Sequence, residues 1–201
     1  MNKAFEVKVA TIKIINALYN ENNVDKATLS SLRGAPTIVS QRAETVWPIM
    51  LPYMAEDLLS PNGTPSWGEN AVYTATRLFA LYQQGSDQFV YAPYDKEKVE
   101  SGKNFFSALA VLRRNPDSRK ALDGRAYALF GSSNFSSVVH SLTQLASILK
   151  SSKLGIKIDF PMLAQNLFDF QTSFENASTV KLLWGQEYYA DIHETKPEGT
   201  K

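Results

Sequence analysis

Apolar side chains recur at steps of three and four residues along most of this 201-residue chain. This spacing puts them on one side of an α-helix, whereas a half-buried β-strand would alternate at every second residue. The stretch from Asn134 to Lys150 is the clearest case, because the asparagine can cap a helix that then carries one apolar face. The spacing predicts an all-α fold. The face of this helix consists of Val138, Leu142, Leu145, Ala146 and Leu149.

Capping residues and prolines mark where other helices begin. Ser66 followed by Glu69 has the pattern of a capping box, and Asn115-Pro116 joins a capping asparagine to proline at the first helical position. Residues 46–52 contain two prolines, which should break this stretch into short turns. We therefore expect a compact bundle of about eight to nine helices.

The first twenty residues contain another helical repeat. Phe5, Val9, Ile12, Ile15 and Tyr19 are separated by three or four residues. This spacing predicts a first helix that has these five side chains on one face.

A loop near the middle of the chain is the best candidate for a boundary. Residues 86–101 have no helical repeat and contain Pro93. A hinge here would divide the chain into an N-terminal helical lobe, residues 1–95, and a C-terminal helical lobe, residues 96–201. The alternative is one continuous domain, since 201 residues suit either arrangement.

Composition excludes several classes of protein. The chain has no cysteine, which excludes disulfides, thiolate metal sites and cysteine nucleophiles. The first eight residues include charges where a secretion signal needs an apolar core, and no uncharged stretch is apolar enough to predict a membrane span. We therefore expect a cytoplasmic protein that does not contact a membrane.

Charge is unevenly distributed along the chain. Residues 101–157 hold 9 Lys/Arg and 2 Asp/Glu, a net charge of +7, whereas residues 1–100 have −2 and residues 158–201 have −4. A basic block of this kind indicates a polyanionic partner such as nucleic acid. A solvated surface without a partner is the alternative interpretation. On composition alone the two have about equal weight.

The sequence contains no recognisable catalytic site. The two histidines, His140 and His193, are far apart and have no metal-ligand spacing, and no phosphate-binding or nucleophile motif occurs. Glu56-Asp57 is better explained as surface charge than as an acid/base pair. We predict no enzyme activity, no cofactor and no metal site.

Aromatic residues have two interpretations. They could stack on nucleobases, but most have the spacing of a helix core, so we expect burial for each. The residues concerned are Trp47, Trp67, Phe105, Phe106, Tyr127 and Trp184.

Several segments resemble, in order, those of the CasB family, the small subunit of the CRISPR type I-E Cascade complex. The closing segment, WGQEYY at 184–189, is similar to the family's W-x-x-x-[FY]-[FY] helix. Two positions depart from the pattern, because Gly34 replaces a basic residue and Thr143 stands where many relatives have arginine. The other segments are residues 27–34, 46–52, 107–114, 123–130, 142–150 and 158–164.

The resemblance implies a helical, non-catalytic subunit. Family members support the guide RNA–target DNA hybrid and the displaced DNA strand. The implied partners are guide RNA, target DNA, the repeating backbone subunit, the large subunit and a second copy of this chain. The alternative is a helical protein-interaction scaffold that does not bind nucleic acid.

The candidate phosphate-binding residues come from the basic block and from motif position. Arginines near the helix start at Pro116 suit phosphate, because guanidinium groups and a helix N-terminus both attract it. From the residues alone, a solvated helical face is slightly favoured over this site. Lys150 and Lys153 are secondary candidates, and Arg33 is chosen on motif position. The full set is Arg33, Arg113, Arg114, Arg119, Lys120, Arg125, Lys150 and Lys153.

Overall fold

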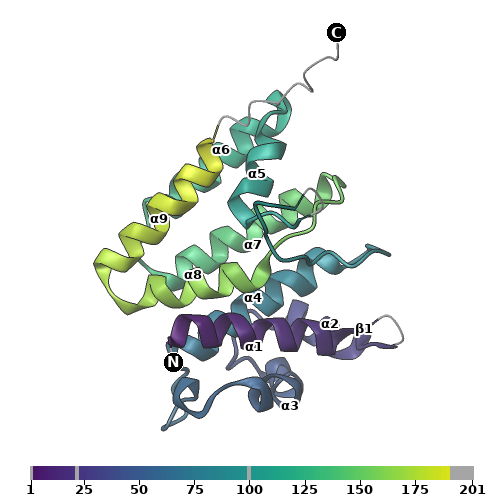
Figure 1. Ribbon diagram of the computed structural model, residues 1–201, viewed down its shortest axis with the longest axis vertical. Helices are drawn as coiled ribbons and strands as arrows, with labels where there is room; N and C mark the ends of the chain where they lie inside the picture. Colours follow the sequence, from purple (N-terminus) through teal and green to yellow (C-terminus); the bar gives the residue numbers. More distant parts are fainter. Residues whose placement is uncertain (1, 21–22, 99–100, 191–201) are drawn as a thin grey trace.

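The computed structural model describes residues 2–20, 23–98 and 101–190 (Figure 1). This part of the chain contains nine α-helices, three short 3-10 helices and one antiparallel hairpin of two-residue strands, β1 (Tyr19–Asn20) and β2 (Asn23–Val24). The prediction of a compact all-α bundle is confirmed. The helices are α1 (Lys3–Leu18), α2 (Lys26–Gly34), η1 (Gln41–Thr45), α3 (Trp47–Met50), η2 (Leu51–Tyr53), η3 (Glu56–Leu58), α4 (Trp67–Gln83), α5 (Phe105–Arg113), α6 (Pro116–Phe130), α7 (Phe135–Ser151), α8 (Phe160–Thr172) and α9 (Phe174–Tyr189).

Helix α4 is the centre of the bundle. All its residues from 71 to 80 are buried, because α1, α2, α7 and α8 pack around it. The predicted capping box starts this helix, since Ser66 Oγ accepts from the Glu69 amide at 3.0 Å and Glu69 Oε2 accepts from the Ser66 amide at 2.7 Å. The predicted apolar face of α7 is also buried in full.

The two halves of the sequence share this core. Helix α8, from the second half, packs against α1 and α4 from the first half, while α9 packs against α5 and α8 (Figure 1). A division into lobes at residues 1–95 and 96–201 remains a proposal. None of the described helices combines the length and the apolar character that a bilayer crossing requires.

Backbone hydrogen bonds fix the long connection between α4 and α5. Ile158 N donates to Val90 O and Lys103 N donates to Lys157 O, both at 2.9 Å. Asp159 then caps α8 by accepting from the Met162 amide at 2.8 Å. The loop expected at 86–101 is therefore tied to the start of α8 and delivers the chain to α5.

The face predicted for α1 is only partly right. Ile15 is buried, and Ile12 and Tyr19 are half-buried against the core, whereas Phe5 is 52% exposed and Val9 is half-buried. The other buried side chains of α1 include Val7, Ile14 and Leu18. Apolar residues occur on more than one side of this helix, so spacing alone does not select the core face. The contacts with α4 and α8 select it.

Half of the aromatic predictions are also wrong. Phe105, Phe106 and Trp184 are buried as expected. Trp67 is the first residue of α4, ahead of the buried part of the helix, and Tyr127 lies on the side of α6 opposite the core. The exposed fractions are 37% for Trp47, 51% for Trp67 and 79% for Tyr127.

Candidate nucleic-acid interface

Five of the predicted cations gather where α5 meets α6. Helix α5 ends at Arg113, and Asn115 starts α6 by accepting from the Asp117 amide at 3.0 Å, with Pro116 at the first position as predicted. The short turn places the end of one basic segment beside the start of another. We call this region the α5–α6 corner, and it contains Arg113, Arg114, Arg119, Lys120 and Arg125.

Arg113 joins this corner to α9. Its Nε and Nη2 donate to Asp123 Oδ1 and Oδ2 at 2.7 and 3.3 Å, and its guanidinium carbon lies 5.4 and 5.0 Å from the ring centres of Tyr188 and Tyr189. Tyr188 Oη also donates to Asp123 Oδ1, at 2.7 Å. The hydrogen bond from Arg113 lowers the pKa of the Asp123 carboxyl. We call these four residues the Arg113 clamp, and it fixes the position of the corner.

The other cations of the corner differ in exposure. Arg114, Arg119 and Lys120 are exposed, although Arg119 Nε donates to the Arg113 carbonyl at 3.1 Å. Arg125 is half-buried, and its Nη1 donates to the carbonyl of Ala121 at 3.1 Å. The corner therefore presents three exposed cations to solvent, supported by arginines that bond to the protein.

The remaining predicted cations lie at the end of α7 and on α2. Lys150 Nζ donates to Gln84 Oε1 at 2.8 Å, and burial, together with the positive charge of Arg33, lowers the pKa of Lys150. Lys153 follows α7 as an exposed residue with φ of 53°. The structure thus places Arg33 near Lys150, on elements other than the α5–α6 corner.

Arg77 is a cation that the sequence interpretation missed. It is only 9% exposed on α4, and its Nη1 donates to Thr143 Oγ1 of α7 at 3.0 Å. Its buried Nε has no hydrogen-bond partner, and burial lowers its pKa. Arg77 is the one charged residue between Glu69 and Asp87, a signal that could have identified it. The Arg77 guanidinium thus contacts Thr143, the position at which the resemblance to the CasB family leads us to expect an arginine.

Histidine and carboxylate groups do not converge in the described part of the chain. His140 lies on a groove whose lining is made of serine, glycine and alanine, with no acid among its residues. Within residues 2–20, 23–98 and 101–190, no three side chains of the metal-ligating types form a group. His193 lies outside the described residues.

Comparison with known proteins decides the family. The family described as CRISPR-associated protein Cse2 matches residues 25–189. The chain belongs to the Cse2 family. Among solved structures, the crystal structure of CasB from Thermobifida fusca is similar, with a TM-score of 0.65 and 19% identity over 94% of this chain and 98% of that one. A search of curated proteins finds no match.

Membership of the Cse2 family implies a subunit of a CRISPR Cascade complex. The resemblance found in the sequence is therefore confirmed at the level of the family. The CasB structure, at 19% identity, supports the fold.

A half-buried acid in this Cse2-family chain predicts a pH dependence of stability. Burial raises the pKa of Glu187 to about 7 from an ordinary 4.5, although a hydrogen bond from Asn104 Nδ2 at 2.6 Å opposes the rise. The folded chain then binds more protons than the unfolded chain between these values, so stability falls as pH rises through this window. The expected loss is on the order of 2 kcal/mol, after allowance for partial solvation.

Urea denaturation at pH 5 and pH 7.5 measures this effect. Glu187→Gln should remove most of the loss, because the amide does not titrate. Glu175→Gln, at an exposed position on the same helix, is the control and should keep the wild-type dependence. If the stability of the Glu187 variant depended on pH as strongly as that of the wild type, another titrating group would be responsible for the loss.

Proposed function

We propose that this Cse2-family subunit stabilises the guide RNA–target DNA hybrid and the displaced strand through sequence-independent phosphate contacts. The observation that carries the proposal is the α5–α6 corner, where Arg114, Arg119 and Lys120 are exposed together. The basic block contains two acids, and one of them, Asp123, is held by Arg113. With five cations and two acids, Asp117 and Asp123, the corner has a net charge of +3.

Charge neutralisation explains how such a surface acts. Lysine and arginine contacts to phosphates release counterions, and they give affinity without reading sequence. Opening a duplex against a guide RNA is nearly balanced in free energy, so a few backbone contacts can shift it toward the hybrid. We assign this contact first to the exposed cations of the corner and the support of the corner to the Arg113 clamp. A second group of contacts comprises Arg33, Lys150 and Lys153, whereas Arg77 is buried against Thr143.

The same proposal includes no catalytic step. Phosphate contact requires no general base and no metal ion, and the described residues bring no acid to the groove at His140. The subunit would act by binding alone, without a cofactor.

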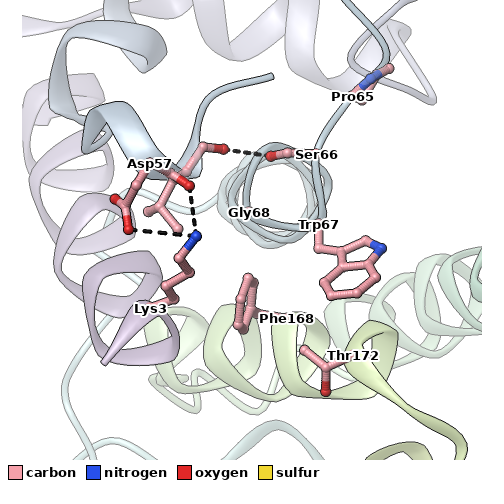
Figure 2. A pocket seen from close by; sticks show the side chains of 9 residues that line it. Lys3, Asp57, Pro65, Ser66, Trp67, Gly68, Phe168 and Thr172 are labelled. Carbon is pink, nitrogen blue, oxygen red and sulfur yellow. Dashed lines mark hydrogen bonds and ion pairs between the residues drawn. The ribbon is translucent and has the colours of Figure 1, made fainter. Parts of the chain in front are cut away.

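A second function is favoured by an apolar region around Trp67. A pocket of about 520 Å³ lies here. Trp67 from α4 and Phe168 from α8 are among the residues that line it (Figure 2). Lys3 Nζ lies at its edge and donates to the Asp57 carbonyl at 3.0 Å. Such a surface suits contact with another protein. The proposed partners are the repeating backbone subunit, the large subunit or a second copy of this chain.

Fluorescence anisotropy over a salt series tests the main proposal. The purified chain should bind labelled single-stranded DNA of several sequences with similar affinity, and log K should fall linearly with log salt concentration. No binding at low salt, combined with retained assembly with the backbone subunit, would favour the scaffold function. Strong preference for one sequence would contradict contact through phosphates alone.

A further inference from the structure

Tyr127 is the most exposed large apolar side chain in the described part of the chain. Its side chain is 79% exposed, and it lies on α6, the helix that also carries Lys120. Seven residues separate the two, so they lie on the same side of the helix, two turns apart. An aromatic ring there contributes little to the core, since Leu122, Ala126 and Leu129 are the buried residues of α6.

Gly124 leaves the space beside this ring open. It lies one turn before Tyr127, and a helical side chain leans back over the turn that precedes it. A Cβ built at Gly124 would have no atom within 4 Å, other than its own helix backbone and chain neighbours. A flat group can therefore approach the ring across Gly124, between Tyr127 and Lys120.

A groove lined with hydroxyl groups begins at the residue after Tyr127. It has a volume of about 600 Å³ and lies between the end of α6 and the first turns of α7. Ser132 is one of the lining residues. Lys181 Nζ of α9 donates a hydrogen bond to the carbonyl oxygen of Ser132 at 3.3 Å. The lining consists of Ala128, Gly131, Ser132, Ser136, Ser137, His140 and Ser141.

The charges around this groove favour an anionic ligand. The chain has no Asp or Glu between Asp123 and Asp159, so neither the lining nor helix α7 contributes a carboxylate. Serine hydroxyls and an imidazole can donate hydrogen bonds to phosphate and sugar oxygens. Tyr127 is an exposed ring on α6, the helix whose end forms one side of this groove. An aromatic ring and a groove of hydrogen-bond donors are the combination that single-stranded nucleic acid requires, because every base can stack on the ring.

We propose that Tyr127 and this groove bind one unpaired nucleotide, whose base stacks on Tyr127 across Gly124 and whose sugar and phosphate lie in the groove. The inference rests on the proposed nucleic-acid function and adds a preference for single strands over duplex. Phosphate contacts at the α5–α6 corner are available to both forms, whereas stacking on Tyr127 requires a base that is not paired.

Three DNA probes test this site by anisotropy: oligothymidine, an abasic oligonucleotide of equal length and a duplex. Tyr127→Ala should weaken oligothymidine binding about 10-fold, whereas Tyr127→Phe, which keeps the ring, should bind as the wild type does. Abasic and duplex binding should be unchanged in both variants. The exposure of Tyr127 predicts an unchanged melting temperature, which excludes misfolding as the cause.

Ser136→Asp tests the groove independently of the ring. Ser136 is exposed in the first turn of α7, where an acidic residue is tolerated, so the variant should fold while its carboxylate repels a phosphate. We expect oligothymidine binding to weaken about 10-fold.

The outcomes separate this site from the proposed function. Wild-type binding to none of the three probes would overturn the function itself. Wild-type binding with an unchanged Tyr127→Ala affinity for oligothymidine would overturn the stacking site alone. Loss of Cascade assembly in Tyr127→Ala, with all DNA binding retained, would assign the exposed ring to a protein partner.

Discussion

Reversing Arg114 and Lys120 to glutamate should weaken binding of single-stranded DNA by about 100-fold at 50 mM salt. Both side chains are exposed at the α5–α6 corner. Their replacement takes away two of the proposed phosphate contacts and adds two repulsive charges at the same place. The salt dependence should become shallower by about 0.7 in slope for each phosphate that is no longer neutralised. Anisotropy titrations at several salt concentrations measure both quantities.

Lys13→Glu combined with Lys96→Glu is the matched control. These lysines are exposed on α1 and in the loop before α5, outside the basic block, and the variant has the same net charge as the corner reversal. Its affinity should fall only slightly, because charges farther away than a Debye length are screened. Equal weakening in both double variants would show that total charge, and not the corner, determines affinity.

Arg113→Gln should behave differently from the corner reversal. The side chain donates to Asp123 and lies against Tyr188 and Tyr189, so its loss opens the Arg113 clamp and lowers the melting temperature. We expect a smaller loss of affinity and an unchanged salt slope, because a residue that positions the corner releases no counterion itself. A slope reduced by about 0.7 with normal stability would instead make Arg113 a phosphate contact.

Local signals predicted the helix starts well. The capping box at Ser66 and the Asn115-Pro116 start both form as expected, because each depends on atoms within one helical turn. The α7 face was also predictable, since the apolar residues of that helix lie on one side. In such segments the local pattern and the tertiary packing select the same conformation.

The failures occur where packing across distant segments decides the outcome. Apolar residues on more than one side of α1 made Phe5 as good a core candidate as Val7, until α4 and α8 selected one side. Spacing also cannot distinguish buried Trp184 from exposed Tyr127, because both follow the helical repeat. Arg77 was missed because its neighbours indicated a buried helix, and its bond to Thr143 joins residues 66 positions apart.

The positions of the candidate cations along the chain were therefore easier to predict than the pairings that these side chains make in the fold. The +7 block pointed to the segment that carries the proposed phosphate contacts. The sequence did not indicate that Asp123 would hold Arg113, or that Arg33 would lie near Lys150. These pairings depend on how α2, α6 and α7 pack, which no local motif encodes.

Replacing Gly102 with alanine should lower the free energy of unfolding by about 3 kcal/mol. A Cβ at this position would lie 1.9 Å from the carbonyl oxygen of Ala92 and 2.7 Å from its carbonyl carbon, and both are backbone atoms. The crossing cannot open locally, because Gly102 N donates to Pro93 O at 3.0 Å and Lys103 N donates to Lys157 O at 2.9 Å. The added methyl group must therefore displace the segment that leads into α5.

Gly124→Ala is also a glycine-to-alanine change, but we expect it to stabilise the chain. Gly124 lies in the interior of α6 with open space around a built Cβ, so alanine should raise the free energy of unfolding by about 1 kcal/mol through its higher helix propensity. Urea denaturation of both variants measures the difference. Similar stability for the two would mean that the chain near Gly102 relaxes easily. A large loss only in Gly102→Ala would establish the close crossing of residues 92 and 102 as the constraint that sets where α5, and with it the α5–α6 corner, begins.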